Sequence, residues 1–277
     1  MSQYLQPLSE ISRADAGRFG GKATALGDML QAGIPVPDGF AVSIDAQRDF
    51  TNKAFSAEFK LEIDRLFQTA KLIRVAVRSS AIAEDSSSAS WAGQLESYLN
   101  VERDGVEDAI RKCWRSIKTK HAREYARDKQ LDESDLLVGV VVQAMIDSEV
   151  SGVMFTVNPT THNRDELVIE GVFGLGEMLV QGIVTPDRFI YDKQRSVVTD
   201  FTIEIKRKAM TYKNGKNQTN VLPLEVGDRA TLREAEVTEL AKLGMAVERY
   251  YGAPRDIEWA RQDGKFYIVQ ARPITTL

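Results

Sequence analysis

Apolar residues recur at helical spacing through much of the first half of the chain. One such segment covers residues 22–32 and is ended by Gly33, before the Pro-rich exit IPVPDGF. A second covers residues 46–70 with a break near Ala54, and a third is VEDAIRKCWRSIKTKHAREYARDK. Between them, KLIRVAVRSS alternates as a strand does, and a Ser-rich loop closing on Gly93 leads to another strand at Leu95. This half predicts an α/β lobe.

From Leu136 onward the pattern is typical of short strands. The β-rich segments are LLVGVVVQAMI, VSGVMFTVNP, ELVIEGVFGLGE, DRFIYDKQRSVVTDFTIEIKRKAM and DIEWARQDGKFYIVQARPI, with one helix, TLREAEVTELAKLGMAVERYYG, before the last. We therefore expect an α+β fold with an N-terminal lobe at about residues 1–135 and a largely antiparallel lobe at 136–277. Ligand sites commonly lie between two such lobes.

The final segment predicts a hairpin with one polar face. Asp256 and Glu258 lie two residues apart on its first strand, and Gln270 and Arg272 lie two residues apart on its second, so each pair projects from one side of its own strand. Carboxylate and amide oxygens are ligands that Mg²⁺ prefers. If Glu258 and Gln270 share a face, they can contribute to one metal site.

The turn of this hairpin decides whether that face is shared. A plain two-residue turn at Asp263 and Gly264 would set Glu258 opposite Val269 and turn Gln270 to the wrong side. A shared metal site therefore requires an odd-length loop or a bulge. We expect a three-residue loop, QDG, with Gly264 in the left-handed conformation.

Two other motifs could bind phosphate. In GRFGGKATALGDML, a glycine pair and Lys22 precede a helix, but Ala16 and Ala23 break the Walker A pattern, and a turn followed by a solvent-facing lysine is the simpler alternative. In VAVRSSAIAEDSSSASWAGQ, Arg78 emerges at a strand end beside small hydroxyl residues, which suits a lid over phosphate. The alternative there is a solvated Ser-rich loop with a surface arginine.

Several other candidate features are assigned no chemistry. FGLGEMLVQG has Leu179 where a dinucleotide fingerprint needs glycine, so Gly174 and Gly176 are interpreted as structural turns. His121 and His162 lie in polar segments and are interpreted as solvated or structural, not as phosphohistidines. The single cysteine, Cys113, lies on an apolar helical stripe and is interpreted as a packing residue.

Composition narrows the class of protein. The chain has 277 residues, a net charge of −4 and 43% hydrophobic residues, which fits a globular protein without an overall basic field for nucleic acid or an anionic membrane. No apolar run approaches the roughly 20 residues that span a bilayer, and the N-terminus lacks a basic start and an apolar core. We expect a cytoplasmic protein that binds neither nucleic acid nor membrane.

Taken together, the segments resemble the N-terminal ATP-binding domain of the phosphoenolpyruvate synthase and pyruvate, phosphate dikinase family, which includes the rifampicin phosphotransferases. They extend from about residue 20 to 275 in the family's order. The matching runs are GGKATALGDMLQAGIPVPDGFAVS, VAVRSSAIAEDSSSASWAGQLESYLNV, VVVQAMIDSEVSGVMFTVNP, GLGE and DIEWARQDGKFYIVQARPIT.

The resemblance implies a single ATP-grasp module over residues 1–277, in which two lobes hold Mg-ATP in the cleft between them. On that pattern, the phosphate-binding and catalytic cations are Lys22, Arg78 and Arg272. The residues around 87–93, with Gly93, form a flap over the phosphates, and Ser97 lies near the nucleotide. The adenine edge spans residues 143–146 and includes Gln143, Met145 and Ile146. The implied Mg²⁺ ligands are Glu258 and Gln270, with Asp256 nearby.

The resemblance also implies a reaction and a partner. In the family, ATP gives its β-phosphoryl group to a histidine on a separate domain, which carries it to pyruvate or another acceptor. Motifs of the phosphohistidine and pyruvate-binding domains are missing here, so we expect only the ATP half-reaction, with a phosphohistidine domain or subunit as partner. Our first hypothesis is phosphoenolpyruvate synthase. The alternatives are the same domain of a rifampicin phosphotransferase or of pyruvate, phosphate dikinase, and a non-catalytic nucleotide-binding regulatory module.

Overall fold

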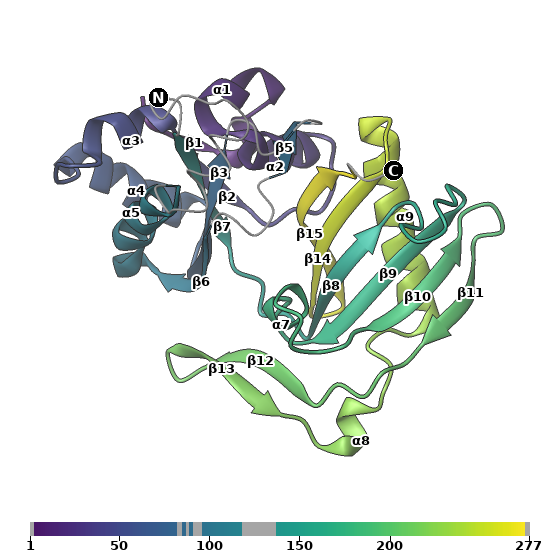
Figure 1. Cartoon of the computed structure of the whole chain (residues 1–277). Coiled ribbons are helices and arrows are strands. Elements are labelled where there is room, and N and C mark those ends of the chain that lie inside the picture. Colours follow the sequence, from purple (N-terminus) through teal and green to yellow (C-terminus); the bar gives the residue numbers. More distant parts are fainter. Residues whose placement is uncertain (1–2, 82–84, 87–88, 91–95, 118–136, 275–277) are drawn as a thin grey trace. The chain divides into compact units, whose positions relative to one another are not determined.

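A computed structural model describes residues 3–81, 85–86, 89–90, 96–117 and 137–274 (Figure 1). The chain divides into two compact units, unit 1 with Met1–Gln31 and Pro37–Met145, and unit 2 with Ala32–Val36 and Ile146–Leu277. The boundary after Met145 corrects the one expected near residue 135. Strand β7 (Val138–Ala144) has the apolar texture of the later strands, but it pairs with strands β2 and β3 and so belongs to unit 1.

Unit 1 is built on a five-stranded antiparallel sheet with the order β1-β2-β7-β3-β6. Its other strands are β1 (Leu5–Pro7), β2 (Gly39–Val42), β3 (Arg74–Ala81) and β6 (Ser97–Glu102), and β4 (Asp85–Ser86) pairs with β5 (Ala89–Ser90). Its helices are α1 (Ala16–Phe19), α2 (Gly21–Gln31), α3 (Ile44–Phe50), α4 (Ala57–Thr69) and α5 (Val106–Ser116), with short 3-10 turns η1 (Leu8–Glu10), η2 (Arg13–Asp15) and η3 (Arg103–Gly105).

The helices of unit 1 begin and end largely where the pattern predicts. α2 stops before Gly33, whose φ of +74° is in the left-handed region. The expected break near Ala54 separates α3 from α4, because the Ser56 hydroxyl accepts a hydrogen bond from the Phe59 backbone N–H and starts a new helix.

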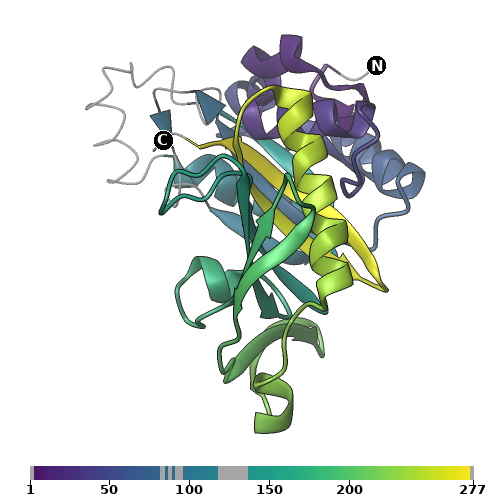
Figure 2. The ribbon, with the colours of Figure 1, turned by 90° about the vertical axis from the view of Figure 1, so that its right-hand side faces the viewer.

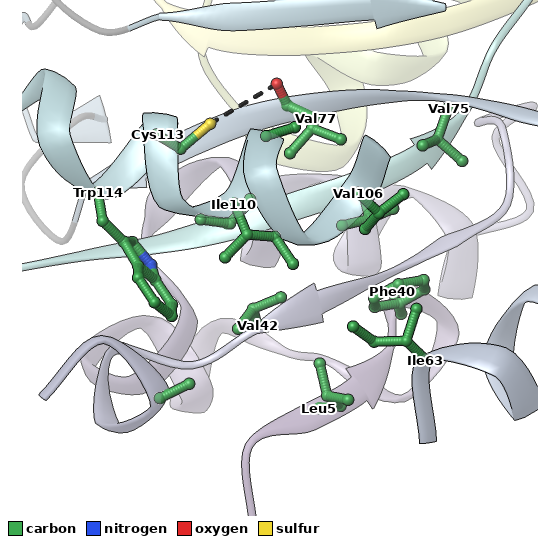
Figure 3. Close-up of a cluster of buried hydrophobic side chains, with 14 of the residues drawn as sticks. Leu5, Phe40, Val42, Ile63, Val75, Val77, Val106, Ile110, Cys113 and Trp114 are labelled. Carbon is green, nitrogen blue, oxygen red and sulfur yellow. Dashed lines mark hydrogen bonds between the residues drawn. The ribbon is translucent and has the colours of Figure 1, made fainter. Parts of the chain in front are cut away.

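The core of unit 1 packs α4 and α5 against one face of the sheet (Figure 3). Val140 and Val142 of β7 and Val77 of β3 lie on this face, and Cys113 of α5 is fully buried among them. Its Sγ donates to the carbonyl oxygen of Val77 over 3.8 Å. Burial raises the pKa of the Cys113 thiol to about 12, so the thiolate needed for reactivity is suppressed. The interpretation of Cys113 as a packing residue is confirmed.

Unit 2 is built on a six-stranded antiparallel sheet with the order β11-β10-β9-β8-β14-β15. These strands are β8 (Val150–Phe155), β9 (Glu166–Phe173), β10 (Asp187–Asp192), β11 (Val197–Thr202), β14 (Arg255–Gln262) and β15 (Lys265–Pro273). The remaining elements are a two-stranded ribbon, β12 (Lys208–Lys213) with β13 (Lys216–Val221), and the helices α7 (Glu177–Val180), α8 (Leu224–Gly227) and α9 (Glu234–Tyr251).

Helix α9 lies along one face of the unit 2 sheet (Figure 2). Gly244 permits the close approach, since a Cβ there would stand 2.6 Å from the Met154 sulfur. Met154, Ile169 and Ile257 form one cross-strand row on this face and are fully buried. The opposite face of the sheet is therefore the one that presents the polar residues of β14 and β15. No helix in the described part of the chain is both long and apolar enough to cross a membrane.

The GLGE segment is a structural turn. Gly174 has a φ of +77°, and a Cβ at this position would lie 2.2 Å from the carbonyl oxygen of Met210. The next residue, Leu175, donates its backbone N–H to that same oxygen over 2.9 Å. Glycine at 174 thus lets the base of the β12–β13 ribbon attach to the sheet, as the structural interpretation of this residue expects.

Candidate functional site

Three of the predicted nucleotide-binding residues lie on one face of the unit 1 sheet. Arg78 pairs directly with Ser97 of β6, and on its other side with Val141 of β7. Gln143 lies two residues beyond Val141 on the same strand, so its side chain shares the face of Arg78 and Ser97. Helix α2 packs on this face, because the Ala23 N–H donates to the hydroxyl of Ser80, two residues after Arg78.

Lys22 comes to the same face of the sheet from the start of α2. Its side chain is only 6% exposed, and its Nζ donates to the carbonyl oxygen of Ser79 over 3.0 Å. Gly20 makes this approach possible, since its φ is +83° and a Cβ would stand 2.1 Å from the Ser80 carbonyl oxygen. The alternative of a solvent-facing lysine is wrong, because the glycine pair folds the start of α2 onto the end of β3.

Gln143 carries a buried polar group that none of the described residues satisfies. The side chain is 2% exposed, and its amide Nε2 has no hydrogen-bond partner within the part of the chain that the structure describes. An unmade hydrogen bond of this kind costs about 1–3 kcal/mol. An acceptor atom on a bound ligand would satisfy this donor, whereas an apolar core would not. This agrees with a role in contacting the nucleotide.

Replacing Gln143 with leucine is expected to separate stability from binding. Gln143→Leu keeps the approximate volume and removes the unpaired donor, so it should raise the free energy of unfolding by about 1 kcal/mol. It should also lower the affinity for ATP. Denaturant unfolding and calorimetry on the same protein check both effects, and a less stable variant with unchanged ATP affinity would show that Gln143 is a core residue.

The remaining predicted residues of unit 1 and the histidines are placed only in part. Gly93 and the flap around residues 87–93 lie outside the described residues, as does His121. Met145 and Ile146 follow β7 and are partly exposed, and the Met145 N–H donates to the Arg74 carbonyl over 2.9 Å. His162 is exposed in a turn with a φ of +59°, in agreement with its interpretation as a loop residue.

The hairpin that carries the predicted metal ligands has a two-residue turn and a bulge. Asp263 and Gly264 have φ values of +50° and +76°, as in a type I′ turn, and Gln262 pairs with Lys265. The expected three-residue loop is wrong, because an Asp-Gly pair adopts two positive φ angles readily. The register then shifts between Trp259 and Glu258, so that Val269 is the extra residue.

The bulge brings the predicted residues onto one face after all. Beyond Val269, Glu258 pairs with Gln270 and Asp256 pairs with Arg272. A bulge was the other condition under which Glu258 and Gln270 could share a site, and this condition is met. Arg272 donates from Nη2 and Nε to Asp256 Oδ2 over 2.6 and 2.8 Å.

The hairpin brings two carboxylates, Asp256 and Glu258, and one arginine, Arg272, onto this face. Burial raises the pKa of Asp256 above its ordinary value, Arg272 opposes the rise, and the nearby charge of Glu258 adds to it. In the described part of the chain, no three His, Cys, Asp or Glu side chains form a metal-binding group by themselves. A cation here would thus take ligands from Glu258, from the Gln270 amide and from oxygens outside the protein.

Two further residues of the same face, Glu170 of β9 and Arg188 of β10, were not predicted from the sequence. They pair with each other, and Glu170 also pairs with Val153 of β8, which in turn pairs with Glu258. Burial raises the pKa of Glu170, Arg188 lowers it, and Asp256 raises it. The one available signal was Glu170 itself, an acidic residue inside the apolar run ELVIEGVF.

Comparison with known proteins extends these observations. The family described as Pyruvate phosphate dikinase, AMP/ATP-binding domain matches residues 51–277. A probable phosphoenolpyruvate synthase from Archaeoglobus fulgidus is 39% identical over 312 residues, which cover 98% of this chain and 41% of that protein. A rifampicin phosphotransferase from Bacillus cereus is 35% identical, over 100% of this chain and 36% of that protein. Among solved structures, a D-alanine–D-alanine ligase from Bacillus anthracis is 9% identical with a TM-score of 0.43, covering 92% of this chain and 57% of that one.

The family match contains most of the candidate residues. It covers Arg78, Ser97, Gln143 and the whole β14–β15 hairpin, while Lys22 lies before its first residue. The chain spans less than half the length of these two curated relatives. The resemblance on which the ATP-grasp expectation rests is confirmed, and the chain belongs to the pyruvate phosphate dikinase AMP/ATP-binding domain family.

Proposed function

We propose that this chain is the Mg-ATP-binding part of a phosphoenolpyruvate synthase. The observation that carries the proposal is the register of the β14–β15 hairpin, which sets Glu258 opposite Gln270 and Asp256 opposite Arg272. In a member of an AMP/ATP-binding family, such a pairing supports metal binding by the first pair. Similarity to proteins named phosphoenolpyruvate synthase supports the choice of enzyme.

The residues present fit a magnesium ion. Glu258 and Gln270 offer a carboxylate and an amide oxygen, and Asp256 lies beside them in a place where burial disfavours its charge. Glu258 and Gln270 would hold the ion, with Asp256 near it. When bound, magnesium would neutralise part of the charge on the nucleotide phosphates and fix their oxygens. Water and phosphate would complete its coordination, since Mg²⁺ usually keeps such ligands.

The cations of the chain have a complementary role. Three cations would bind phosphate oxygens: Lys22, held by the Ser79 carbonyl oxygen, Arg78, on the same face of its sheet, and Arg272 of the hairpin. Phosphoryl transfer depends mainly on positioning and on charge stabilisation, and it needs no nucleophile from this chain. Ser97, Gln143, Met145 and Ile146 would contact the remainder of the nucleotide.

The reaction that the resemblance implies can be written with its partner. ATP, water and a histidine of a phosphohistidine domain would give AMP, inorganic phosphate and phosphohistidine. Both phosphoanhydride bonds of ATP break, the β-phosphoryl group moves to the imidazole nitrogen, and the γ-phosphoryl group moves to water. The exposed turn position of His162 gives no reason to propose it as the acceptor.

Calorimetry and labelled ATP test the function in two steps. The chain is expected to bind ATP in the presence of Mg²⁺, more weakly without the metal, and to transfer label from the β-phosphate of ATP to an added phosphohistidine domain. The absence of Mg-dependent ATP binding would refute the proposal. Binding without transfer under any condition would favour a non-catalytic regulatory module instead.

A second candidate function is the ATP-binding part of a rifampicin phosphotransferase. The supporting observation is the 35% identity to such an enzyme across the whole chain. Both functions would use the same nucleotide-binding residues, so the acceptor distinguishes them. Adding the phosphohistidine domain and the acceptor-binding domain of either enzyme, with pyruvate or rifampicin, and identifying the labelled product decides between the two.

A further inference from the structure

Glu170 lies in line with the proposed metal ligands. One cross-strand row runs over five consecutive strands of the unit 2 sheet, and its members are Gln270, Glu258, Val153, Glu170 and Arg188. Residues in such a row project to the same face. Glu170 and Glu258 are thus separated by a single intervening residue, Val153, although they are far apart in the sequence.

The spacing of this row brings the two carboxylates near one another. Neighbouring strands lie about 4.8 Å apart, so the Cα atoms of Glu170 and Glu258 are about 10 Å apart. Each glutamate side chain extends roughly 4 Å through bonds of about 1.5 Å. Val153, which lies between them, has a shorter side chain than glutamate, so two glutamates that lean toward one another can approach a common hydrated ion from both sides.

The position of Glu170 is fixed from the opposite face of the sheet. A Cβ on Gly152 would stand 1.8 Å from the Glu170 carbonyl oxygen and 2.9 Å from the buried ring of Trp259. The same ring lies 3.6 Å from where a Cβ of Gly171 would be. Glycines at both positions let β8, β9 and the indole pack tightly, which holds the backbone of Glu170 in place.

The carboxylate of Glu170 has no hydrogen-bond donor among the residues that the structure describes. It is partly buried, and it makes no hydrogen bond or ion pair of its own with any other side chain that the structure describes. Arg188 acts on it favourably through space, whereas Asp256 acts on it unfavourably. A desolvated acceptor in these surroundings favours a donor supplied by a ligand.

We propose that Glu170 is an outer-shell positioning residue of the Mg-nucleotide site and accepts a hydrogen bond from a water molecule bound to the ion held by Glu258 and Gln270. The inference rests on the proposed function. It places Glu170 outside the direct ligands, which agrees with the absence of a three-member metal-binding group among the described His, Cys, Asp and Glu side chains. Arg188, the cross-strand neighbour of Glu170, favours the charged form of that side chain and so partly offsets the effect of burial on its pKa.

The test compares three variants by calorimetry of ATP binding over a range of Mg²⁺ concentrations. Glu170→Gln keeps the shape and removes the charge, and it should raise the Mg²⁺ concentration for half-maximal ATP binding by about tenfold, within the range for outer-shell partners. Glu170→Asp keeps the charge on a shorter side chain and should recover part of this loss. Glu239→Gln makes the same charge change at an exposed position of α9, on the opposite face of the sheet, and should match the wild type.

Thermal unfolding without metal separates this role from a structural one. Glu170→Gln should melt at the wild-type temperature or above it, because a partly buried charge has been removed. If Glu170→Gln needed the same Mg²⁺ concentration as the wild type, the role of Glu170 would be overturned, but the proposed function would stand. A lower melting temperature together with an equal loss of ATP affinity at every Mg²⁺ concentration would also overturn that role. A wild-type chain that shows no Mg-dependent ATP binding would overturn the proposed function and this inference with it.

Discussion

Glu258→Ala is expected to lower the affinity for ATP in the presence of Mg²⁺ by at least about 100-fold. Losing a residue that only supports a metal ligand costs about 10- to 100-fold in metal affinity, and losing a direct ligand should cost at least the upper value. Glu258 is the one proposed direct ligand that offers a carboxylate, and the Gln270 amide opposite it binds a hard cation more weakly. The fold should survive, because Glu258 lies on the face of the sheet away from the buried row of Met154 and Ile257.

Calorimetry with and without Mg²⁺ measures this effect, and circular dichroism verifies the fold. Glu239→Ala is the matched control, since it removes one carboxylate from an exposed position of unit 2. Glu258→Ala should bind ATP with nearly the same affinity at every Mg²⁺ concentration, because the metal no longer contributes to binding. Glu239→Ala should keep the magnesium dependence of the wild type. If Glu258→Ala kept the magnesium dependence of the wild type, the ion would have to be bound elsewhere.

Lys206→Met is expected to cost unit 2 about 3–5 kcal/mol of folding free energy, as is usual when one member of a buried ion pair is removed. Lys206 and Asp187 are both 0% exposed at their side chains and form a direct ion pair. Asp187 also accepts the backbone N–H groups of Glu204 and Thr231 over 2.9 and 2.7 Å. Without Lys206, its negative charge would stay buried without a counter-ion.

Chemical denaturation of Lys206→Met and Lys208→Met side by side checks this expectation. Lys208 is exposed, so its replacement removes the same charge at a cost within about 0.5 kcal/mol. The Lys206 pair connects the start of β10 to the segment that leads into the β12–β13 ribbon. Equal stabilities of the two variants would mean that Asp187 is adequately held by its backbone donors alone.

The sequence pattern predicts local structure well wherever the determinants are local. Gly33 ends α2 and Ser56 starts α4, because each acts through its own turn of backbone. The even spacing of Asp256 and Glu258 likewise places them on one face, since alternation along a strand is a local property. These features follow from the residues themselves.

Features set by tertiary pairing could not be read in the same way. β7 has the composition of a unit 2 strand but pairs within unit 1, and Lys22 is buried by the approach of its helix to β3. Glu170 was missed because β14 inserts beside β8, so Glu258 and Glu170 become near neighbours only through the order of strands in the sheet. The bulge at Val269 compensates for a turn that alone would have misdirected Gln270.

Paramagnetic NMR can locate the metal-nucleotide complex at the β14–β15 hairpin. Mn²⁺ replaces Mg²⁺ with ATP, and amide signals are compared with those of the Mg-ATP complex. If the hairpin binds the metal, signals from residues 256–258 and 270–272 should broaden selectively, and the ribbon tip at Asn214 and Gly215, an internal reference, should be affected far less. Unbroadened hairpin signals in a sample that binds Mn-ATP would show that the hairpin does not hold the metal-nucleotide complex.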